Sequence, residues 1–396
     1  MSNIRYQLSD ITYDAAEAEA VAEVLTSKWL SVGPRTAAFE RRFAEFLDAP
    51  HAVAVSSCTA ALHLALLAAG VGAGDEVLVP SYTFVASVNP ILYVGARPVF
   101  VDISGPDDLN LDPTEVEAHV SPRTKAIVAV HMAGFPADMD RLMAIAEEHG
   151  LAVIEDACHA IGAKYESEGS RYDGRFAGTI GTVGCFSFFA NKNLVTGEGG
   201  MLVTSDESIA TRARLARSHG MTKTSWDKAS GRATDYDVEQ FGFNYRGTEL
   251  TAALGLVQLG KLPDSNRRRG ELVARYRDRL ADVPGVTIPF ADRMDSAHHI
   301  FPVLAGDQTS RDALRAELLE RGVQTSIHYP PVHEFTQYHA LAGDDTSLPH
   351  TVAVSRRELT LPLHPLLNDE DVDAICQAVR ESVEAIASTA MVASAP

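Results

Sequence analysis

Cysteine is scarce in this chain, and its cysteines show no arrangement that marks a disulfide framework or a zinc site. They form no CxxC pair and have no histidine at metal-ligand spacing; the four residues are Cys58, Cys158, Cys185 and Cys376. We therefore expect reduced thiols, most of them buried, and no bound metal.

Long apolar stretches are missing as well. No segment approaches the roughly 20 consecutive apolar residues that a transmembrane helix needs. Residues 1–14 also lack a basic region followed by an apolar one. The sequence therefore predicts a cytoplasmic protein with no membrane partner.

Basic residues are in deficit. The chain has 34 Lys and Arg residues against 53 Asp and Glu residues, which gives a net charge of -19 at pH 7. A surface of this charge repels the phosphates of nucleic acids and anionic lipids, so we expect no nucleic-acid partner. A small anionic ligand is still compatible with the sequence, because helix N-termini and a few local cations can bind it.

Short apolar segments alternate with longer amphipathic ones, and this alternation predicts the fold class. The short segments are 51–57, 76–81, 97–102, 126–131, 151–156, 184–189 and 200–205. Strands that are apolar on both faces and separated by helices are typical of a mostly parallel sheet covered on each side. We therefore predict an α/β protein with a seven-stranded sheet, whose ligands bind at the carboxyl ends of the strands.

The pattern changes in the second half of the chain. Residues 219–242 show no periodicity and are predicted to form a long polar loop. After Pro263 a basic helix is predicted to begin a smaller α+β unit, with a strand near 299–304 and helices near 311–321 and 369–386. The predicted division is a large domain over 1–262, a small domain over 263–388 and a disordered tail over 389–396.

The end of the first strand is a candidate anion site. Ser57 and Thr59 stand where the apolar segment 51–57 gives way to an Ala/Leu-rich helix. Free backbone N–H groups and the positive end of the helix dipole favour a phosphate there, with the two hydroxyls as further donors. The same residues also fit an ordinary helix N-cap.

Two acids and a histidine follow the fifth strand. Glu155 and Asp156 close the segment LAVIED, and His159 lies three residues further on. Two carboxylates at a strand end suit a metal site or acid–base catalysis, and Glu155 could instead face a neighbouring basic side chain. A pyridine cofactor needs one such carboxylate, which keeps its ring nitrogen protonated.

Lys192 occupies a short turn between two apolar segments, and Gly197, Gly199 and Gly200 follow it. Burial at such a place lowers the pKa of a lysine, and the neutral amine can attack an aldehyde and carry a proton. An exposed turn lysine is the alternative. A nucleotide-binding P-loop is excluded, because in that motif the glycines precede the lysine.

These signals follow one another as pyridoxal phosphate requires: a phosphate site, an aromatic residue (Tyr82 or Phe84), an acid and a lysine. The sequence also resembles the DegT and StrS type of sugar aminotransferases, a branch of the fold-type I pyridoxal-phosphate enzymes. The resemblance covers nearly the whole chain and rests on motifs such as SSCTAALHLALLAAG, VIEDACHAIGA, FSFFANKNLVTGEGG, NYRGTELTAALGLVQL and HYPPVH.

The resemblance implies a role for several residues around the cofactor. Lys192 would be the Schiff-base lysine, Asp156 the partner of the pyridine nitrogen and His159 the contact to the ring hydroxyl. Phe84 would stack on the ring face. The residues implied to hold the phosphate are Cys58, Thr59, Ala60 and Ser187.

The resemblance also implies a homodimer with shared active sites, in which Asn244 reaches the phosphate bound by the neighbouring chain. A sugar nucleotide carries a diphosphate that needs cations. The candidate cations are Lys223, Lys228, Arg232 and Arg246, and the side chains available to cover the sugar or base are Trp226, His328 and Tyr329. The loop residues among them also fit a solvated polar surface. Family members often carry Pro and Thr where this chain has Ala190 and Asn191, which puts the substrate in question more than the cofactor.

The implied reaction moves an amino group from glutamate to a nucleotide-linked keto-6-deoxyhexose, at C-4 in preference to C-3, by way of pyridoxamine phosphate. The product would be an amino sugar for a glycosylated natural product such as an antibiotic, or for a surface glycan. Two alternatives stay open: a pyridoxal-phosphate sugar dehydratase or lyase on the same fold, and a non-catalytic regulator that binds a sugar nucleotide. One branch of the family has histidine in place of the lysine, and Lys192 argues against that branch.

Overall fold

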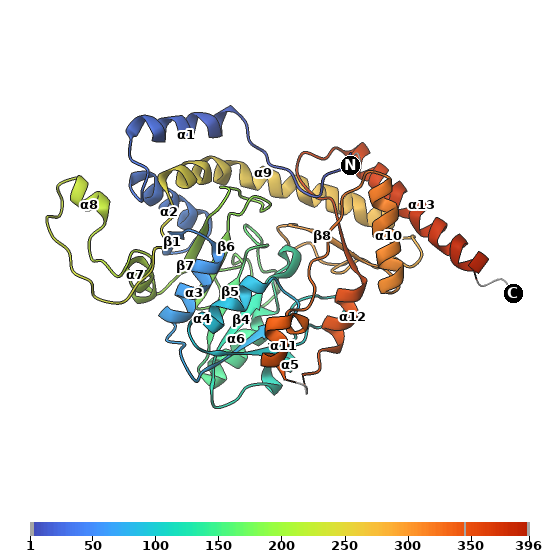
Figure 1. Ribbon diagram of the computed structural model, residues 1–396, viewed down its shortest axis with the longest axis horizontal. Helices are drawn as coiled ribbons and strands as arrows, with labels where there is room; N and C mark the ends of the chain where they lie inside the picture. Colours follow the sequence, from blue (N-terminus) through green and yellow to red (C-terminus); the bar gives the residue numbers. More distant parts are fainter. Residues whose placement is uncertain (1–3, 344–345, 394–396) are drawn as a thin grey trace.

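The predicted apolar segments form the strands of one sheet in the computed structural model, which describes residues 4–343 and 346–393 (Figure 1). The strands lie in the order β1-β7-β6-β5-β4-β2-β3, and neighbours run parallel except that β7 is antiparallel to both β1 and β6. The predicted fold class, an α/β protein with a mostly parallel seven-stranded sheet, is confirmed. The bounds of the strands are β1 His51–Val55, β2 Glu76–Pro80, β3 Arg97–Val101, β4 Thr124–Val130, β5 Ala152–Asp156, β6 Val183–Ser187 and β7 Gly200–Thr204.

Helices cover both faces of this sheet, because successive side chains of a strand point to opposite faces and both rows are apolar. In β1, Val53 and Val55 face one cluster of buried side chains, whereas Ala52 and Ala54 face another. The first face is covered by α3 (Cys58–Ala68), α4 (Asn89–Tyr93) and α7 (Glu207–Ala216). The second face is covered by α2 (Pro34–Phe46), α5 (Pro113–Ala118), α6 (Met139–His149) and the start of α9 (Glu249–Leu280).

Helix α9 passes through Pro263 without a break. The sequence predicts a new helix after this proline, because proline lacks an N–H group and its ring clashes with the carbonyl four residues earlier. Packing on both sides of the proline offsets this cost of about 3 kcal/mol: Leu259 and Leu262 pack beneath the sheet, and Leu272 and Tyr276 pack in a second core. The predicted boundary between 262 and 263 falls inside the helix, and the division into two domains stays a prediction.

The second core surrounds an antiparallel pair of strands, β8 (Phe301–Leu304) and β9 (Glu358–Leu361). The end of α9, α10 (Gln308–Glu320) and α13 (Asp369–Ala393) pack around them. The sequence predicts β8, α10 and α13 but misses β9, α11 (Thr336–Ala342) and α12 (Pro349–Arg357). Helix α13 continues to Ala393, where the sequence predicts a tail from 389, because alanines favour a helix. Residues 394–396 lie outside the described residues.

Helix α1 (Ala15–Ser27) packs along α9 (Figure 1). Its Glu17 carboxylate is buried and accepts hydrogen bonds from Gln258 (2.7 Å) and Lys261 (2.9 Å) of α9. Short 3-10 helices lie at Val85–Ser87, Met132–Gly134 and Val332–Glu334. Within 4–343 and 346–393, no helix is long and apolar enough to cross a membrane.

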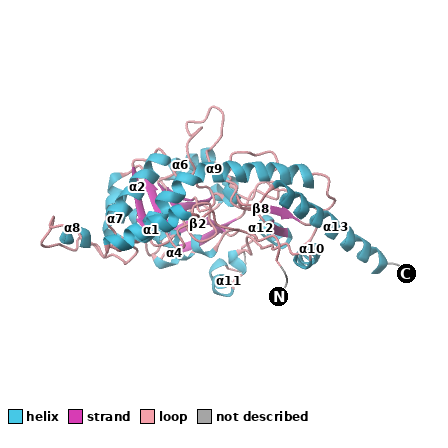
Figure 2. Ribbon diagram, turned by 90° about the horizontal axis from the view of Figure 1, so that it is seen from above, coloured by secondary structure: helices cyan, strands magenta, loops and turns pink. Residues whose placement is uncertain are grey.

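Residues 219–242 form an arm that projects from the body of the molecule beyond α7 (Figures 1 and 2). A backbone bridge joins Met221 to Val238, so the two sides of the arm run antiparallel. The sequence predicts no regular element here, but a short helix, α8 (Ser225–Ala229), forms within the arm. The helix has a local cause: Thr224 and Asp227 form a reciprocal capping box, in which each side chain accepts the backbone N–H of the other residue.

Candidate active site

The carboxyl ends of β5 and β6 and the N-terminus of α3 border a cavity of about 360 Å³. Residues from distant parts of the chain meet there, and they include most of those that the sequence predicts for the cofactor. The predicted residues that line the cavity are Cys58, Thr59, Phe84, Asp156, His159, Ser187, Lys192, His328 and Tyr329. Ligands of α/β sheets bind at this edge of the strands, so we take the cavity as the candidate active site.

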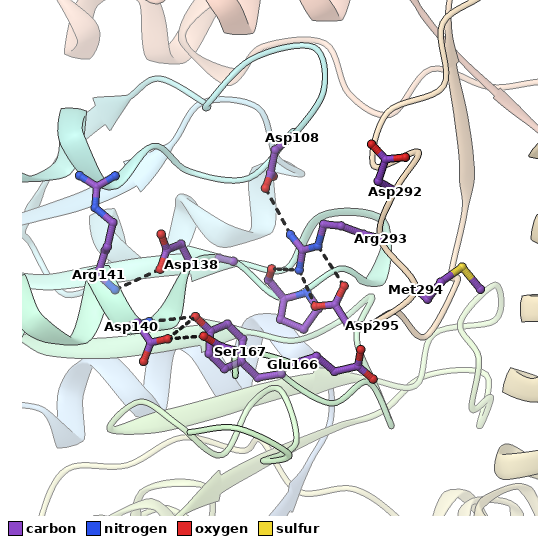
Figure 3. A pocket seen from close by; sticks show the side chains of 13 residues that line it. Asp108, Asp138, Asp140, Arg141, Glu166, Ser167, Asp292, Arg293, Met294 and Asp295 are labelled. Atoms are coloured by element: carbon purple, nitrogen blue, oxygen red, sulfur yellow. Dashed lines mark hydrogen bonds and ion pairs between the residues drawn. The ribbon is translucent and has the colours of Figure 1, made fainter. Parts of the chain in front are cut away.

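A larger hollow of about 660 Å³ lies elsewhere, between the loop around Asp108 and the segment 292–295 (Figure 3). Its charged groups pair with one another: Arg293 contacts both Asp108 (3.2 Å) and Asp295 (2.6 Å). None of the residues predicted for catalysis lines it. Because its remaining charge is mostly acidic, this hollow suits a phosphorylated ligand less well than the smaller cavity does.

The N-terminus of α3 forms one wall of the cavity. The Ser57 side chain caps this helix by accepting the Ala60 N–H (3.2 Å), so that N–H is committed to the cap, and Ala60 does not line the cavity. The N–H groups of Cys58 and Thr59 belong to the first helical turn, where no intrahelical acceptor exists. Ser57 is thus a helix cap, and the adjacent N–H groups and the helix dipole still attract a phosphate.

Gly200 lets β7 lie directly against this wall. A Cβ atom at residue 200 would be 2.5 Å from the Ser57 carbonyl carbon and 2.6 Å from the Cys58 nitrogen. A side chain there would push the helix N-terminus away from the sheet. Close packing of β7 against this helix therefore explains why residue 200 is a glycine.

Asp156 and Glu155 are neighbours in β5 and face opposite sides of the sheet, because strand residues alternate. Asp156 lines the cavity, and its carboxylate accepts hydrogen bonds from the Ser87 hydroxyl (2.7 Å) and the Cys158 N–H (3.2 Å). Glu155 is fully buried on the other side. Of the two carboxylates that the sequence offers, Asp156 is the one that can reach a ligand in the cavity.

Glu155 instead fixes the loop before β6. Its carboxylate accepts hydrogen bonds from His131 Nε2 (2.9 Å) and from the N–H groups of Gly178 (2.7 Å), Ile180 (2.7 Å) and Gly181 (2.5 Å). Burial alone would raise the pKa of this carboxyl, but His131 and the backbone donors hold the pKa below its usual value. Four donors around one buried carboxylate indicate a structural group.

We expect Glu155→Gln to lower the free energy of unfolding by about 3 kcal/mol, because the amide would point a donor at backbone N–H groups. Since the folded-state pKa is depressed, this stabilisation is present above the usual glutamate pKa and is lost as the pH falls through the folded value. Urea unfolding at neutral and acid pH measures both effects. Glu168→Gln, at an exposed site, is the control and should change stability by less than about 0.5 kcal/mol. Equal midpoints for Glu155→Gln and the wild type at neutral pH would contradict this role.

His159 lies beside Asp156 at the cavity wall. Its Nε2 forms a hydrogen bond with the Tyr329 hydroxyl (3.0 Å), and its buried Nδ1 has no hydrogen-bond partner among the described residues. Burial, followed by the nearby Lys192 charge, lowers the pKa of His159 well below its usual value, so the ring is neutral. A buried nitrogen without a partner is costly, which indicates that a ligand completes its hydrogen bonding. Phe84 lies at the open side, 57% exposed, with its ring 5.9 Å from that of Tyr329.

Lys192 follows β6, and its side chain lines the cavity instead of standing in an exposed turn. Burial lowers the pKa of its amine, and the nearby Cys158, Asp156 and Cys58 oppose this shift in part. The Nζ atom lies 3.3 Å from His299 Nε2. A lysine with a lowered pKa in a cavity can attack an aldehyde as the neutral amine.

His299, Asn193 and Ser87 join this site although the sequence does not single them out. His299 contacts Lys192, Asn193 contacts His299, and Ser87 contacts Asp156. The signal for His299 is the pair His298 and His299, which stands at the start of the predicted strand 299–304. Ser87 and Asn193 carry no sequence signal that separates them from ordinary polar residues.

The candidate substrate residues of the arm do not reach the cavity of their own chain. Trp226 packs edge-on against Trp29 (5.0 Å between ring centroids), and Lys228 lies over the Tyr236 ring at 3.5 Å. Arg246 donates to the Ser218 hydroxyl (3.1 Å). The predicted residues that do not line the cavity are Ala60, Lys223, Trp226, Lys228, Arg232, Asn244 and Arg246. The structure therefore does not bring the arm to the cavity of its own chain.

Two thiols meet at the cavity wall. The Sγ atoms of Cys58 and Cys158 lie 3.0 Å apart, and Asp156 is close enough that one atom from each of the three residues falls within 4.8 Å of the others. Burial raises the pKa of Cys58 to about 12, so its thiol stays protonated. A protonated thiol is a poor nucleophile.

Comparison with known proteins agrees with this site. Residues 12–380 match the model of the DegT/DnrJ/EryC1/StrS aminotransferase family. The chain is 43% identical over 376 residues to the spore coat polysaccharide biosynthesis protein SpsC of Bacillus subtilis (strain 168), covering 93% of this chain and 94% of that protein. The crystal structure of the aminotransferase TlmJ from Streptoalloteichus hindustanus is similar with a TM-score of 0.88 and 38% identity, covering 96% of this chain and 100% of TlmJ.

A further relative has solved structures with the cofactor. The sugar aminotransferase Spr1654 from Streptococcus pneumoniae, in its PLP form, aligns with a TM-score of 0.88 and 31% identity over 97% of this chain and 99% of that chain. The same protein also has a solved PMP form. Pyridoxal phosphate fits the present cavity, which offers an anion site, a buried nitrogen without a partner, a carboxylate and a lysine. The chain belongs to the DegT/DnrJ/EryC1/StrS aminotransferase family and is a pyridoxal-phosphate-dependent sugar aminotransferase.

Proposed function

We propose that this enzyme transfers an amino group from glutamate to a nucleotide-linked keto-6-deoxyhexose, with C-4 favoured over C-3 as the carbon that receives it. The observation that carries the proposal is the cavity in which Lys192, Asp156 and His159 lie beside the N-terminus of α3. The name of the Bacillus subtilis relative assigns that protein to polysaccharide biosynthesis. This supports a sugar acceptor, whose aminated product serves a surface glycan or a glycosylated antibiotic.

The residues of the cavity would hold the cofactor by complementary chemistry. The N–H groups of Cys58 and Thr59 and the Ser187 hydroxyl would bind the phosphate. Asp156 would keep the ring nitrogen protonated, and Lys192 would bond to the aldehyde carbon. When bound, pyridoxal phosphate supplies an electron sink for the carbon that loses its proton.

Two further residues would fix the ring. His159 has the unpaired Nδ1 that could meet the ring hydroxyl, and the Tyr329 hydroxyl holds its other nitrogen. Phe84 would cover the open side of the cavity. A ring held at its nitrogen, hydroxyl and face is oriented for proton transfer.

Lys192 carries the proton in both half-reactions. The neutral Nζ of Lys192 would accept the proton that leaves the α-carbon of glutamate. It would then donate this proton to the cofactor. In the second half-reaction the same amine returns a proton in the opposite direction, so that the sugar carbon gains both nitrogen and hydrogen. Burial lowers the pKa of this amine, which favours the neutral form that accepts the proton.

We propose a homodimer in which Asn244 of the partner subunit completes the phosphate site. Asn244 is exposed in the single chain and follows the projecting arm. The arm also carries Lys223, Lys228 and Arg232, which are exposed as well. A partner's arm laid over the cavity would bring these cations to the diphosphate of the substrate.

Charge reversal in the arm tests this arrangement. We expect Lys223→Glu/Lys228→Glu to raise the KM for the sugar nucleotide about tenfold or more, since each tenfold change needs about 1.4 kcal/mol. The half-reaction with glutamate should keep its rate, because glutamate carries no diphosphate. The control Arg41→Glu/Lys125→Glu reverses the same number of exposed charges outside the arm. If both half-reactions slow equally, the arm does not bind the nucleotide.

A two-step assay tests the proposed function. The pyridoxal form is first treated with glutamate alone, and an aminotransferase yields 2-oxoglutarate and the pyridoxamine form without any sugar. The pyridoxamine form is then offered keto-sugar nucleotides, and the aminated carbon is read by NMR. A dehydratase would instead use the pyridoxamine form to release water from the sugar. Turnover with C-3 keto sugars alone would contradict the C-4 assignment.

A further inference from the structure

A chain of hydrogen bonds leads from fixed backbone carbonyls to the Lys192 amine. Asn266 Nδ2 donates to the Ile161 carbonyl (2.8 Å), so Asn266 presents its Oδ1 to Asn193. Asn193 Nδ2 donates to that oxygen (2.9 Å) and to the Ala297 carbonyl (2.7 Å). With its amide nitrogen engaged twice, Asn193 faces His299 with Oδ1, which can only accept.

The tautomer of His299 follows from this order. Asn193 Oδ1 lies 3.1 Å from His299 Nδ1, so Nδ1 must carry the proton. In a neutral imidazole the other nitrogen, Nε2, is then an acceptor. That nitrogen lies 3.3 Å from Lys192 Nζ.

The doubly protonated form of His299 is disfavoured. Its side chain is buried, and burial, followed by the proximity of Lys192, His159 and Arg269, lowers its pKa well below the usual value. The ring also packs against that of His159, with centroids 4.4 Å apart. His299 is therefore held neutral and in one orientation.

We propose that His299 is a positioning residue, which orients the catalytic amine by accepting a hydrogen bond from Lys192 Nζ at its Nε2. The inference rests on the proposed role of Lys192 and adds a residue to it. Among the described residues, His299 is the hydrogen-bond partner of Nζ. When the amine takes up a proton, the bond to a neutral acceptor becomes charge-assisted, so His299 stabilises the ammonium without taking the proton itself.

Two substitutions distinguish the effect of the Nε2 acceptor from the effect of ring packing. His299→Phe keeps an aromatic ring against His159 and removes the acceptor, and we expect the half-reaction with glutamate to slow about ten- to a hundredfold, the size of a hydrogen bond to a charged group. The limb of the pH–rate profile that belongs to Lys192 should move to lower pH, because the ammonium loses its acceptor. His299→Gln, whose amide oxygen can take the place of Nε2, should recover about tenfold of the rate and the position of the limb.

His298→Asn is the matched control. Like His299, His298 is buried, but it lines no part of the cavity, and its Nδ1 has no partner among the described residues. Its φ of 49° lies in the left-handed region, which asparagine tolerates. We expect this variant to keep the wild-type rate and pH profile.

The outcomes discriminate between positioning and packing. Wild-type rate and profile in His299→Phe, or a slower rate with an unmoved limb and no recovery in His299→Gln, would overturn the proposal. If His299→Phe does not fold, nitrogen-15 NMR of the wild type decides, with the His299 signal assigned by its absence in His299→Gln. An unprotonated Nε2 across the range in which free histidine titrates supports the proposal, and a protonated Nε2 overturns it. Failure of borohydride to label Lys192 in the wild type would instead remove the proposed function itself.

Discussion

Lys192→Ala is expected to slow amino transfer from glutamate by about four orders of magnitude, which is the upper range for a positioned acid–base group. The variant loses both the amine that bonds to the aldehyde and the group that moves the proton. The fold should persist, since the side chain lines a cavity rather than the core. Production of 2-oxoglutarate measures the rate, and circular dichroism checks the fold.

Two controls sharpen this result. Lys164→Ala removes a lysine of the exposed surface, outside the cavity, and should leave the rate unchanged. Added methylamine should restore part of the activity of Lys192→Ala, because a small amine can enter the vacated space. A Lys192→Ala protein that turns over at the wild-type rate would refute the assignment.

Asp156→Asn should lower the rate of the same half-reaction by about two to three orders of magnitude, the usual cost of removing one electrostatic stabiliser. Asparagine has nearly the same shape, its Oδ1 can still accept from the Cys158 N–H, and its amide nitrogen can donate to the Ser87 hydroxyl oxygen, so the cavity should keep its form. It carries no charge to hold a proton on the pyridine nitrogen. Stopped-flow absorbance after mixing with glutamate measures the change.

The effect of Asp156→Asn should fall on the chemistry and spare the attachment of the cofactor. Borohydride should still label Lys192 in this variant, since the lysine is intact. Asp112→Asn is the control, because Asp112 caps α5 and asparagine caps a helix equally well. A normal rate in Asp156→Asn would show that another group protonates the ring.

The sheet could be predicted because its strands are apolar on both faces, which makes each one a continuous run in the sequence. β9 could not, since ELTL forms a strand only by pairing with β8 more than fifty residues earlier in the chain. Pro263 predicts a helix boundary, but α9 continues through it. Packing against two cores offsets the local cost of the proline, and no local pattern reveals this packing. Local sequence thus predicts the elements that bury themselves and misses those that depend on distant partners.

The meeting of Asp156, His159 and Lys192 in one cavity could be predicted for a similar reason. Asp156 ends β5, His159 follows it and Lys192 follows β6, and parallel strands bring their carboxyl ends to one edge of the sheet. His299 comes from a segment more than a hundred residues away, and only the fold brings it to Lys192. The arm residues Lys223, Lys228 and Arg232 lie outside the cavity of their own chain, and their role in binding the substrate stays a prediction.

The most direct test of the account is borohydride reduction of the purified enzyme with pyridoxal phosphate, followed by peptide mapping. The account predicts one stable label per chain, on the peptide that contains Lys192, and loss of the label after prior conversion with glutamate. A protein that takes up no label, or carries it on a different lysine, would contradict the account.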